Sequence, residues 1–475
     1  MSGRPRAAEE RERGRPQLLL AKHCNVWRCV MYLFLLFFSL LQGIAVGWVN
    51  SSTGVHTFLT FNAWMNESET LRTAQNFDFV WGSNATSIPW WRAANPAAVL
   101  GFYMPFTRDP TQGHNPDPAR ITKPLSWWQV HHPEVVFYQC DRKTPAYECF
   151  GGQPCRPVVP LDLSAPSTLD VQFSLGVEPA AAAGYDAVCL DNFSTQNNWG
   201  GCGSFSGPGG AWVGRYNGSH SDPLYESDTL QWLTRFVDRA HALNLSVIPN
   251  YGVGQVTPTS TVVSGIVDGV LDEGGWVHWG NATSWQWLDN CASLYAGCPQ
   301  ALMNADVFAQ RLAWARLLAQ RGKAFFPINE WGPGTDFGMN PTGIPYNISG
   351  DSHRWIRQWV VAAQLLSQGA AGGGTYLVCL QCYGAESYYS EEYGARVGTA
   401  LGEPVLNATT GVWRREFSGA TVFVNPASLA GGSDGGPSPQ PVELEGSYRD
   451  LYGGLFPRGQ YLLNATSGWI LLKEQ

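Results

Sequence analysis

The chain has 475 residues, 44% hydrophobic and 14% charged, which is enough apolar content for a large core and excludes a wholly disordered protein. Residues 1–29 are basic, with seven Lys or Arg against three Glu. Because the formal net charge is −8, the remaining chain is acidic, which argues against nucleic acid as a partner. No nucleotide-binding, HExxH or complete zinc-ligand pattern occurs, so we expect no metal and no cofactor.

An apolar segment follows the basic tail. Residues 30–49, VMYLFLLFFSLLQGIAVGWV, form a run of 20 residues that is long enough to span a bilayer. The positive-inside rule predicts a cytosolic tail at 1–29 and a lumenal or extracellular chain after Asn50. We therefore expect a single-pass type II membrane protein of the Golgi, the vacuole or the plasma membrane. A signal peptide cleaved near Ala45-Val46-Gly47 is the alternative and would give a secreted protein.

Sequons and cysteines also indicate the secretory pathway. Nine of the 11 cysteines follow the apolar segment; Cys291 and Cys298 are predicted to pair, and two of Cys140, Cys149 and Cys155 to close another loop. An odd number leaves a free thiol or an intermolecular bond. All ten Asn-X-Ser/Thr sequons lie after the segment, at Asn50, Asn66, Asn84, Asn192, Asn217, Asn244, Asn281, Asn347, Asn407 and Asn464.

Eight apolar runs predict eight β-strands between residues 57 and 400. They are Phe58–Trp64, Phe77–Gly82, Ala98–Met104, Asp186–Asp191, Leu245–Tyr251, Val267–Glu273, Ala324–Glu330 and Gly373–Cys379. Helical apolar spacing occurs between several of them, at Asp228–Leu243, Asp306–Arg321 and His353–Gln368. This alternation predicts an α/β fold, a (β/α)8 TIM barrel, and a doubly wound open sheet is the alternative. The Pro-rich insertion 105–162 is expected to form a loop or small subdomain over the barrel mouth.

The pattern of apolar residues changes after residue 400. Residues 401–475 contain short strand-like runs separated by turns, with no helical pattern. They predict a small C-terminal all-β domain, with strands at Val412–Phe417, Ala420–Asn425, Val442–Leu444, Tyr461–Leu463 and Trp469–Leu472.

Two predicted barrel strands end in acids, Asp191 on the fourth and Glu273 on the sixth. TIM barrels keep their chemistry at the C-terminal ends of the strands, and paired carboxylates hydrolyse glycosides. We expect Asp191 to act as nucleophile or ion stabiliser. Glu273 is the candidate acid/base, since an apolar wall from Trp276 and like charge from Asp272 would raise its pKa. The alternatives are a structural cap for Asp191 and a solvated loop position for Glu273.

Other residues at predicted strand ends could complete a sugar site. Glu330, at the end of the seventh strand, rivals both acids for a catalytic role. Flat aromatic side chains stack on sugar rings, and amides and acids bind hydroxyl groups, although core packing is the alternative use of each tryptophan. The candidate substrate contacts are Trp64, Trp81, Asn192, Asn250, Tyr251, Asp272, Trp276, Asn329 and Trp331.

The run Gly184-Tyr-Asp-Ala-Val-Cys-Leu-Asp-Asn192 resembles a strand of poorly characterised glycoside-hydrolase-like barrel families. These are akin to the endo-polygalactosaminidase-like group and, more distantly, to the α-galactosidase clan. The resemblance extends from about Phe58 to the end, with Ala187 in place of the usual glycine. It is carried further by Val159-Pro-Leu-Asp-Leu-Ser164, Val267–Glu273, Trp413-Arg-Arg-Glu-Phe417, Val422–Pro426 and Tyr448-Arg-Asp-Leu451.

The resemblance implies a TIM barrel with a terminal β module and a catalytic pair at Asp191 and Glu273. Together with the residues above, it predicts a glycoside hydrolase that acts on a carbohydrate partner. A non-catalytic carbohydrate-binding barrel is one alternative. A Golgi glycosyltransferase is the other, although no Asp-X-Asp metal clamp lies at a predicted strand end.

Overall fold

The computed structural model describes residues 55–60, 65–111, 122–148, 158–207, 209–273, 275–276, 305–329, 354–369, 376–378, 391–426, 439–464 and 467–474. The predicted cytosolic tail 1–29 and membrane span 30–49 lie outside these residues, as do the cysteines expected to pair at 291 and 298. Within the described residues no helix combines the length and the apolar character needed to cross a membrane.

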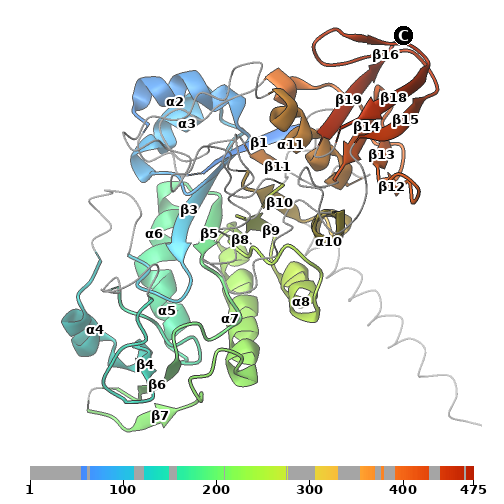
Figure 1. Ribbon diagram of the computed structural model, residues 1–475. Helices are drawn as coiled ribbons and strands as arrows, with labels where there is room; N and C mark the ends of the chain where they lie inside the picture. The colour runs from blue at the N-terminus through green and yellow to red at the C-terminus, as the bar shows by residue number, and fades with distance from the viewer. Residues whose placement is uncertain are drawn as a thin grey trace, which may run out of the picture. The chain divides into compact units, whose positions relative to one another are not determined.

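Eight parallel strands enclose the main apolar core of the described chain (Figure 1). Pairing joins β11-β1-β2-β3-β5-β8 and, separately, β9-β10; a parallel bridge between Asn250 and Leu271 links β8 to β9, and β10 contacts β11. The strands succeed one another in chain order, which gives a TIM-barrel-like ring and not the doubly wound sheet. They are β1 (His56–Thr60), β2 (Phe79–Trp81), β3 (Val99–Pro105), β5 (Ala187–Asp191), β8 (Ser246–Pro249), β9 (Gly269–Asp272), β10 (Ala324–Pro327) and β11 (Tyr376–Val378).

Several barrel strands stop earlier than the apolar runs predict. Strands β8 and β10 end at Pro249 and Pro327, before their predicted ends, whereas β3 ends at Pro105, one residue beyond its predicted end. Proline has no backbone N–H, so it donates no ladder hydrogen bond at that position. As a result Asn250 and Asn329 follow the strands that were predicted to contain them.

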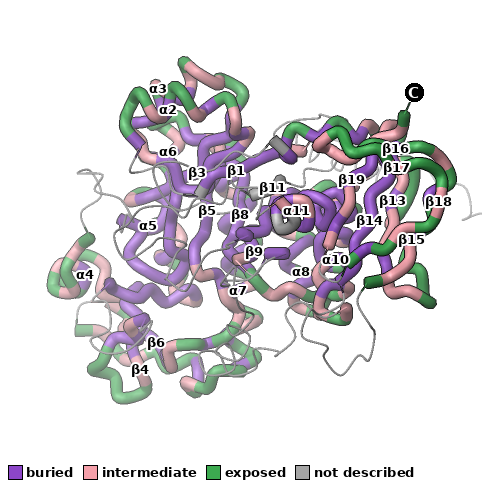
Figure 2. Tube along the Cα trace, turned by 45° about the horizontal axis from the view of Figure 1, so that its top comes forward, coloured by how far each residue is buried: buried purple, intermediate pink, exposed green. Residues whose placement is uncertain are grey.

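The barrel interior is packed with aromatic rings. Phe326 meets Phe58 edge-on at 5.1 Å between ring centroids and Phe79 at 4.6 Å. Gly101 leaves room for a neighbour, because a Cβ there would collide with the buried sulfur of Cys189. Figure 2 shows the burial concentrated on the barrel strands, with exposed residues on outer segments such as α4 (Leu125–His131) and the residues 140–144 that follow β4 (Tyr138–Gln139).

Acids that precede two barrel strands stabilise the opposite end of the barrel. Asp186 accepts a hydrogen bond from the Leu100 amide at 2.8 Å and pairs with Arg92 at 2.6 Å. Asp268 bonds the Val247 amide and His241 in the same way, both at 2.8 Å. These acids stabilise the start of a neighbouring strand and lie at the end of the barrel that serves stability.

Helices separate the barrel strands. The predicted Asp228–Leu243 helix begins earlier, because the Asp222 carboxylate caps the amides of Leu224 and Tyr225 and Pro223 suits the first helical position. The helices between barrel strands are α2 (Glu67–Thr73), α3 (Ile88–Ala94), α5 (Thr168–Gln172), α6 (Glu178–Ala183), α7 (Pro223–Ala242), α8 (Pro258–Ile266), α10 (Ala305–Gln320) and α11 (Arg354–Ser367).

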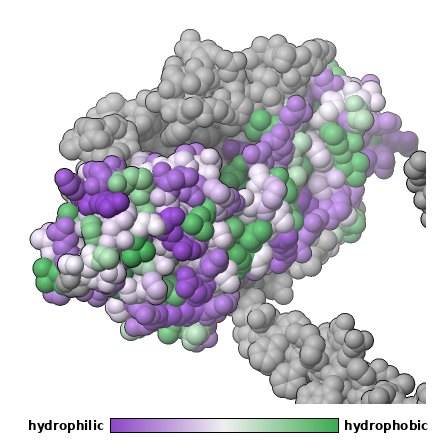
Figure 3. Space-filling view, turned by 90° about the horizontal axis from the view of Figure 1, so that it is seen from below, coloured by the Kyte–Doolittle hydropathy of each residue, from purple (hydrophilic) through white to green (hydrophobic). Residues whose placement is uncertain are grey.

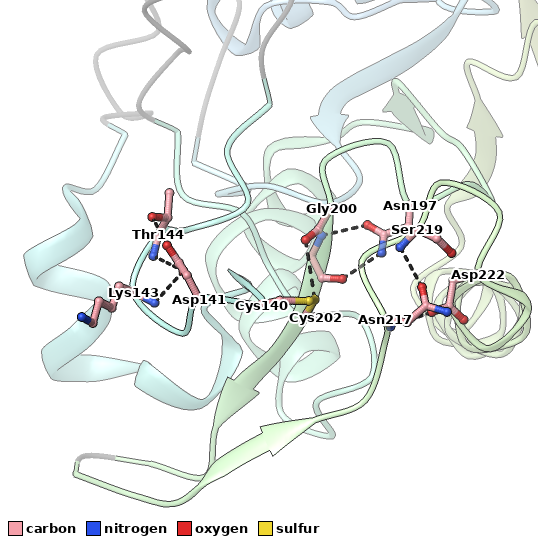
Figure 4. The surroundings of a disulfide bond; sticks show 11 residues. Cys140, Asp141, Lys143, Thr144, Asn197, Gly200, Cys202, Asn217, Ser219 and Asp222 are labelled. Atoms are coloured by element: carbon pink, nitrogen blue, oxygen red, sulfur yellow. Dashed lines mark hydrogen bonds between the residues drawn. A yellow bond between two sulfur atoms is a disulfide. The ribbon is translucent and has the colours of Figure 1, made fainter.

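The predicted insertion 105–162 forms a subdomain together with a second excursion that the sequence did not reveal. Its three-stranded sheet takes β4 from the insertion, and β6 (Gly201–Phe205) and β7 (Trp212–Gly214) from the segment after β5. A disulfide between Cys140 and Cys202 joins the two segments (Figure 4). Of the pairs predicted within the insertion, those that include Cys140 are therefore wrong, because its partner belongs to a strand 62 residues away. A pair of Cys149 and Cys155 stays a prediction, since both lie outside the described residues.

The surface seen from below in Figure 3 mixes hydrophobic and hydrophilic residues and has no single extended apolar area over its described part.

The C-terminal part is all-β, as predicted. Its main sheet has the order β12-β13-β14-β19-β16-β17, beside a hairpin of β15 and β18, and all pairs are antiparallel. The buried Arg415 donates 2.9 Å hydrogen bonds to the carbonyls of Leu365 and Leu366 at the end of α11. The strands are β12 (Val405–Leu406), β13 (Trp413–Glu416), β14 (Ala420–Asn425), β15 (Gln440–Leu444), β16 (Tyr448–Arg449), β17 (Leu455–Phe456), β18 (Gly459–Leu463) and β19 (Ser467–Lys473).

Candidate active site

Three successive barrel strands bring polar side chains together at their C-terminal ends. Strand β5 ends at Asp191, Asn250 follows β8, and Glu273 follows β9. Because β5, β8 and β9 are neighbours in the ring, these three side chains meet at the same edge. This is the end at which TIM barrels carry their chemistry.

The Asn250 amide bridges the two acids. Its Nδ2 donates one hydrogen bond of 3.0 Å to Asp191 Oδ1 and another of 3.0 Å to Glu273 Oε1. Two such bonds from one nitrogen place the acceptor oxygens no more than about 6 Å apart. Because the two N–H bonds of a planar amide diverge by about 120°, well-aligned bonds give a separation of about 5 Å. The acids predicted from the fourth and sixth strands therefore share one site.

Asp191 is buried and held by further donors. The Tyr103 hydroxyl donates to Oδ2 at 2.6 Å, and the Asn192 amide donates to the same oxygen at 2.9 Å. With Asn250, three donors stabilise a negative charge on this carboxylate. Burial and the charge of Asp191 raise the pKa of Tyr103 well above its usual range, so the hydroxyl keeps its proton and remains a donor.

Glu273 has the opposite character. Its pKa is raised to about 7, mainly because the carboxyl is withdrawn from water, with further contributions from the charges of Asp191 and Asp272; the Asn250 hydrogen bond opposes the rise. A large share of Glu273 is therefore protonated near neutral pH. Two acids whose environments favour opposite protonation states are suited to the separate roles of nucleophile and proton donor.

Trp81, Trp276 and Asn329 contact other residues of the protein. The indole N–H of Trp276 donates to Gln364 at 2.9 Å, and the Trp276 backbone amide donates to Asn329 Oδ1 at 2.6 Å. Trp81 is buried and meets Tyr103 edge-on at 5.8 Å. Packing and hydrogen bonds within the protein engage these side chains, and their contact with a sugar stays a prediction.

The structure describes some of the remaining candidate residues and not others. Tyr251 is buried, packs against Phe193, and has its pKa raised to about 12, mainly by burial. Asp272, the last residue of β9 and the sequence neighbour of Glu273, is fully buried. Trp64, Glu330 and Trp331 lie outside the described residues.

Tyr103 is the site residue that the sequence analysis missed. It lies near the C-terminal end of β3, the strand that pairs with β5, opposite Cys189 in the register. A hydroxyl-bearing residue within an otherwise apolar run, two positions before the strand ends, was the available signal. It was obscured because a tyrosine in such a run is equally suited to core packing.

Asn192 belongs to a formal sequon, yet its amide takes part in the site. The residue has a left-handed backbone with φ of 56°, and Nδ2 donates to Asp191. We expect Asn192 to carry no glycan when the protein is made in a eukaryotic secretory pathway, because Nδ2, the atom that a glycan would modify, contacts the buried Asp191 carboxylate at 2.9 Å. A mass-spectrometric glycopeptide map tests this, with the exposed sequons at Asn217, Asn244 and Asn407 as internal controls. Occupancy of Asn192 would remove Asp191 from the site.

No cluster of three His, Cys, Asp or Glu side chains in the described ranges has the arrangement of a metal site. The described site contains a pair of acids, the Asn250 amide between them, and the Tyr103 hydroxyl and Asn192 amide that donate to Asp191.

The described part of the chain is TIM-barrel-like, and at the C-terminal end of its strands one amide bridges two acids. Searches for a matching protein family and for a curated relative found none. Solved structures that it resembles are glycoside hydrolases, at low sequence identity. Aspergillus fumigatus Ega3, in complex with galactosamine, is 13% identical, with 72% of this chain and 97% of that chain covered and a TM-score of 0.36.

Two further solved structures give similar values. The glycoside hydrolase domain of PelA from Pseudomonas aeruginosa is 14% identical, with 70% of this chain and 96% of that chain covered and a TM-score of 0.38. An α-amylase from Malbranchea cinnamomea is 10% identical, with 88% and 96% covered and a TM-score of 0.42. Likenesses of this strength say nothing about activity, which has to be judged from the carboxylates themselves.

Proposed function

We propose that the protein is a retaining glycoside hydrolase, with Asp191 as nucleophile and Glu273 as acid/base. The observation that carries the proposal is the Asn250 amide, whose two 3.0 Å hydrogen bonds imply a carboxylate separation of about 5 Å. Retaining enzymes hold their carboxyl groups roughly 5–5.5 Å apart, whereas inverting enzymes leave roughly 6.5–9.5 Å for a water molecule.

The reaction then has two steps. An Asp191 oxygen attacks the anomeric carbon while the bond to the leaving oxygen breaks, and Glu273 donates its proton to that oxygen. In the second step the Glu273 carboxylate takes a proton from water, and the water oxygen attacks the anomeric carbon and releases Asp191. Two displacements at one carbon return the sugar with its original anomeric configuration.

We further propose that the barrel acts on a carbohydrate in the lumen of the secretory pathway or at the cell surface. The apolar run 30–49, the basic tail before it and the ten sequons after it support this location. The disulfide between Cys140 and Cys202 adds support, because such bonds persist in oxidising compartments.

A panel of aryl glycosides of common hexoses and hexosamines, in both anomeric forms, tests the activity with the full chain. We expect hydrolysis of at least one member, with NMR showing the same anomeric configuration in the first product as in the substrate. An inverted product would contradict the double displacement. Binding without turnover would support a non-catalytic carbohydrate-binding barrel, and a requirement for a sugar nucleotide would support a glycosyltransferase.

A further inference from the structure

Asn250 differs from the other amides at the site because one of its atoms contacts both acids. A primary amide nitrogen carries two hydrogens, and here one points to Asp191 Oδ1 and the other to Glu273 Oε1. The residue is only 7% exposed and follows directly on Pro249, the last residue of β8. Its backbone amide is also fixed, since it donates to the Leu190 carbonyl at 2.7 Å. The donor group is thus rigidly placed between the two acids.

We infer that Asn250 is a positioning residue that sets the separation of Asp191 and Glu273 and couples their charge states. This inference rests on the proposed function for its role in turnover, although the coupling itself is a property of the resting protein. A substrate-binding role, which the sequence suggested, is the less favoured use of this side chain because both amide hydrogens already point to the acids.

The proposed reaction moves negative charge from one end of this bridge to the other. In the resting site the charge is on Asp191, so the hydrogen bond to Asp191 is the charge-assisted one. After the first step Asp191 is a neutral ester and Glu273 is a carboxylate, so the other hydrogen bond becomes charge-assisted. Charge-assisted bonds are roughly twice as strong as neutral ones, and the amide needs no movement to serve both states.

Other charged and titratable groups act on Asp191 and Glu273. Asp272 adds like charge beside Glu273, and Tyr103 donates to Asp191. The buried pair of Arg108 and Glu148 acts on the site through its effect on Tyr103. Among these groups, Asn250 donates to Glu273 and is the donor that opposes the rise of its pKa. Its removal should therefore move the titration of Glu273 to higher pH.

Carboxyl NMR of the full chain labelled with ¹³C in glutamate measures that titration without a substrate. The Glu273 signal is the one lost in Glu273→Gln, and we expect its midpoint to move to higher pH in Asn250→Ala. Asn197→Ala is the matched control, because Asn197 is also buried and its side-chain amide bonds the Gly201 backbone, at 2.8 and 3.0 Å. An unmoved midpoint in Asn250→Ala, or an equal movement in Asn197→Ala, would overturn the inference.

A second measurement covers the case in which Asn250→Ala does not fold. The side-chain amide signals of Asn250 in the otherwise unchanged chain should titrate with the midpoint of Glu273, and this step should vanish in Glu273→Gln. Amide signals that ignore the Glu273 titration would overturn the coupling. On an active aryl glycoside, Asn250→Ala should lower kcat roughly 10²-fold with little change in KM. If the full chain hydrolysed no glycoside, the proposed function would be refuted. Both titrations would still test the coupling between Asn250 and Glu273.

Discussion

An Asp191→Asn variant is expected to lose about 10⁴-fold or more of the hydrolysis rate, because the neutral amide removes the attacking carboxylate. The substitution changes the charge of this side chain much more than its shape. Asparagine has nearly the same shape, so Tyr103 and Asn192 can still pack around it, while the charge that their hydrogen bonds stabilise is gone. The measurement is kcat/KM on an aryl glycoside that the unchanged protein hydrolyses.

Asp186→Asn is the matched control for that variant. It makes the same chemical change on the same strand region, at the opposite end, where Asp186 binds the Leu100 amide and Arg92. We expect lower stability from this control but an intact turnover number once the protein is folded. If Asp191→Asn kept its activity, or if both variants lost activity to the same extent, Asp191 would not be the nucleophile.

Glu273→Gln should show a different pattern. General acid catalysis contributes about 10²–10⁴-fold, and its contribution depends on how much the leaving oxygen needs a proton. The variant should therefore lose most activity on alkyl or sugar leaving groups and little in the first step on nitrophenyl glycosides, whose leaving group departs as a stable anion. A uniform loss across leaving groups would contradict the role of Glu273 as proton donor.

The barrel and its two acids could be predicted from the sequence because both are encoded locally. Each strand is a short apolar run, and β5 and the turn after β9 each carry an acid at the C-terminal end. Burial on both faces removes alternation from parallel strands, so their length and their flanking turns mark them. The antiparallel strands after residue 400 were recognisable for a similar local reason, their turns.

What the sequence could not provide were contacts between distant segments. Cys140 pairs with Cys202 because a second excursion after β5 completes the sheet of the insertion, and no local pattern connects the two. Tyr103 and Asn250 acquire their roles from neighbouring strands, not from their own runs. Trp276 looked like a sugar platform, yet Gln364, 88 residues away, engages its indole N–H. Such partners become visible only when the chain is folded.

The raised pKa of Glu273 implies that ionisation of this side chain lowers the free energy of unfolding above neutral pH. A carboxyl whose pKa rises from 4.5 to about 7 on folding is penalised for ionising in the folded state. The penalty is absent below the pKa of the unfolded chain, grows as pH rises, and is complete above about pH 7. Glutamine cannot ionise. Glu273→Gln should therefore be more stable than the unchanged protein at pH 8, by on the order of 2–3 kcal/mol, and equally stable near pH 4.

Urea unfolding of both proteins at pH 4, 6 and 8 measures this difference in the free energy of unfolding. Glu443→Gln provides the control, because it makes the same chemical change at an exposed position on β15. A variant that is inactive toward poor leaving groups and yet more stable at pH 8 would identify Glu273 as an acid of raised pKa kept for its chemistry. Equal stability of Glu273→Gln and the unchanged protein at pH 8 would mean that Glu273 ionises freely. It would then lack the proton that the first step of the proposed reaction requires.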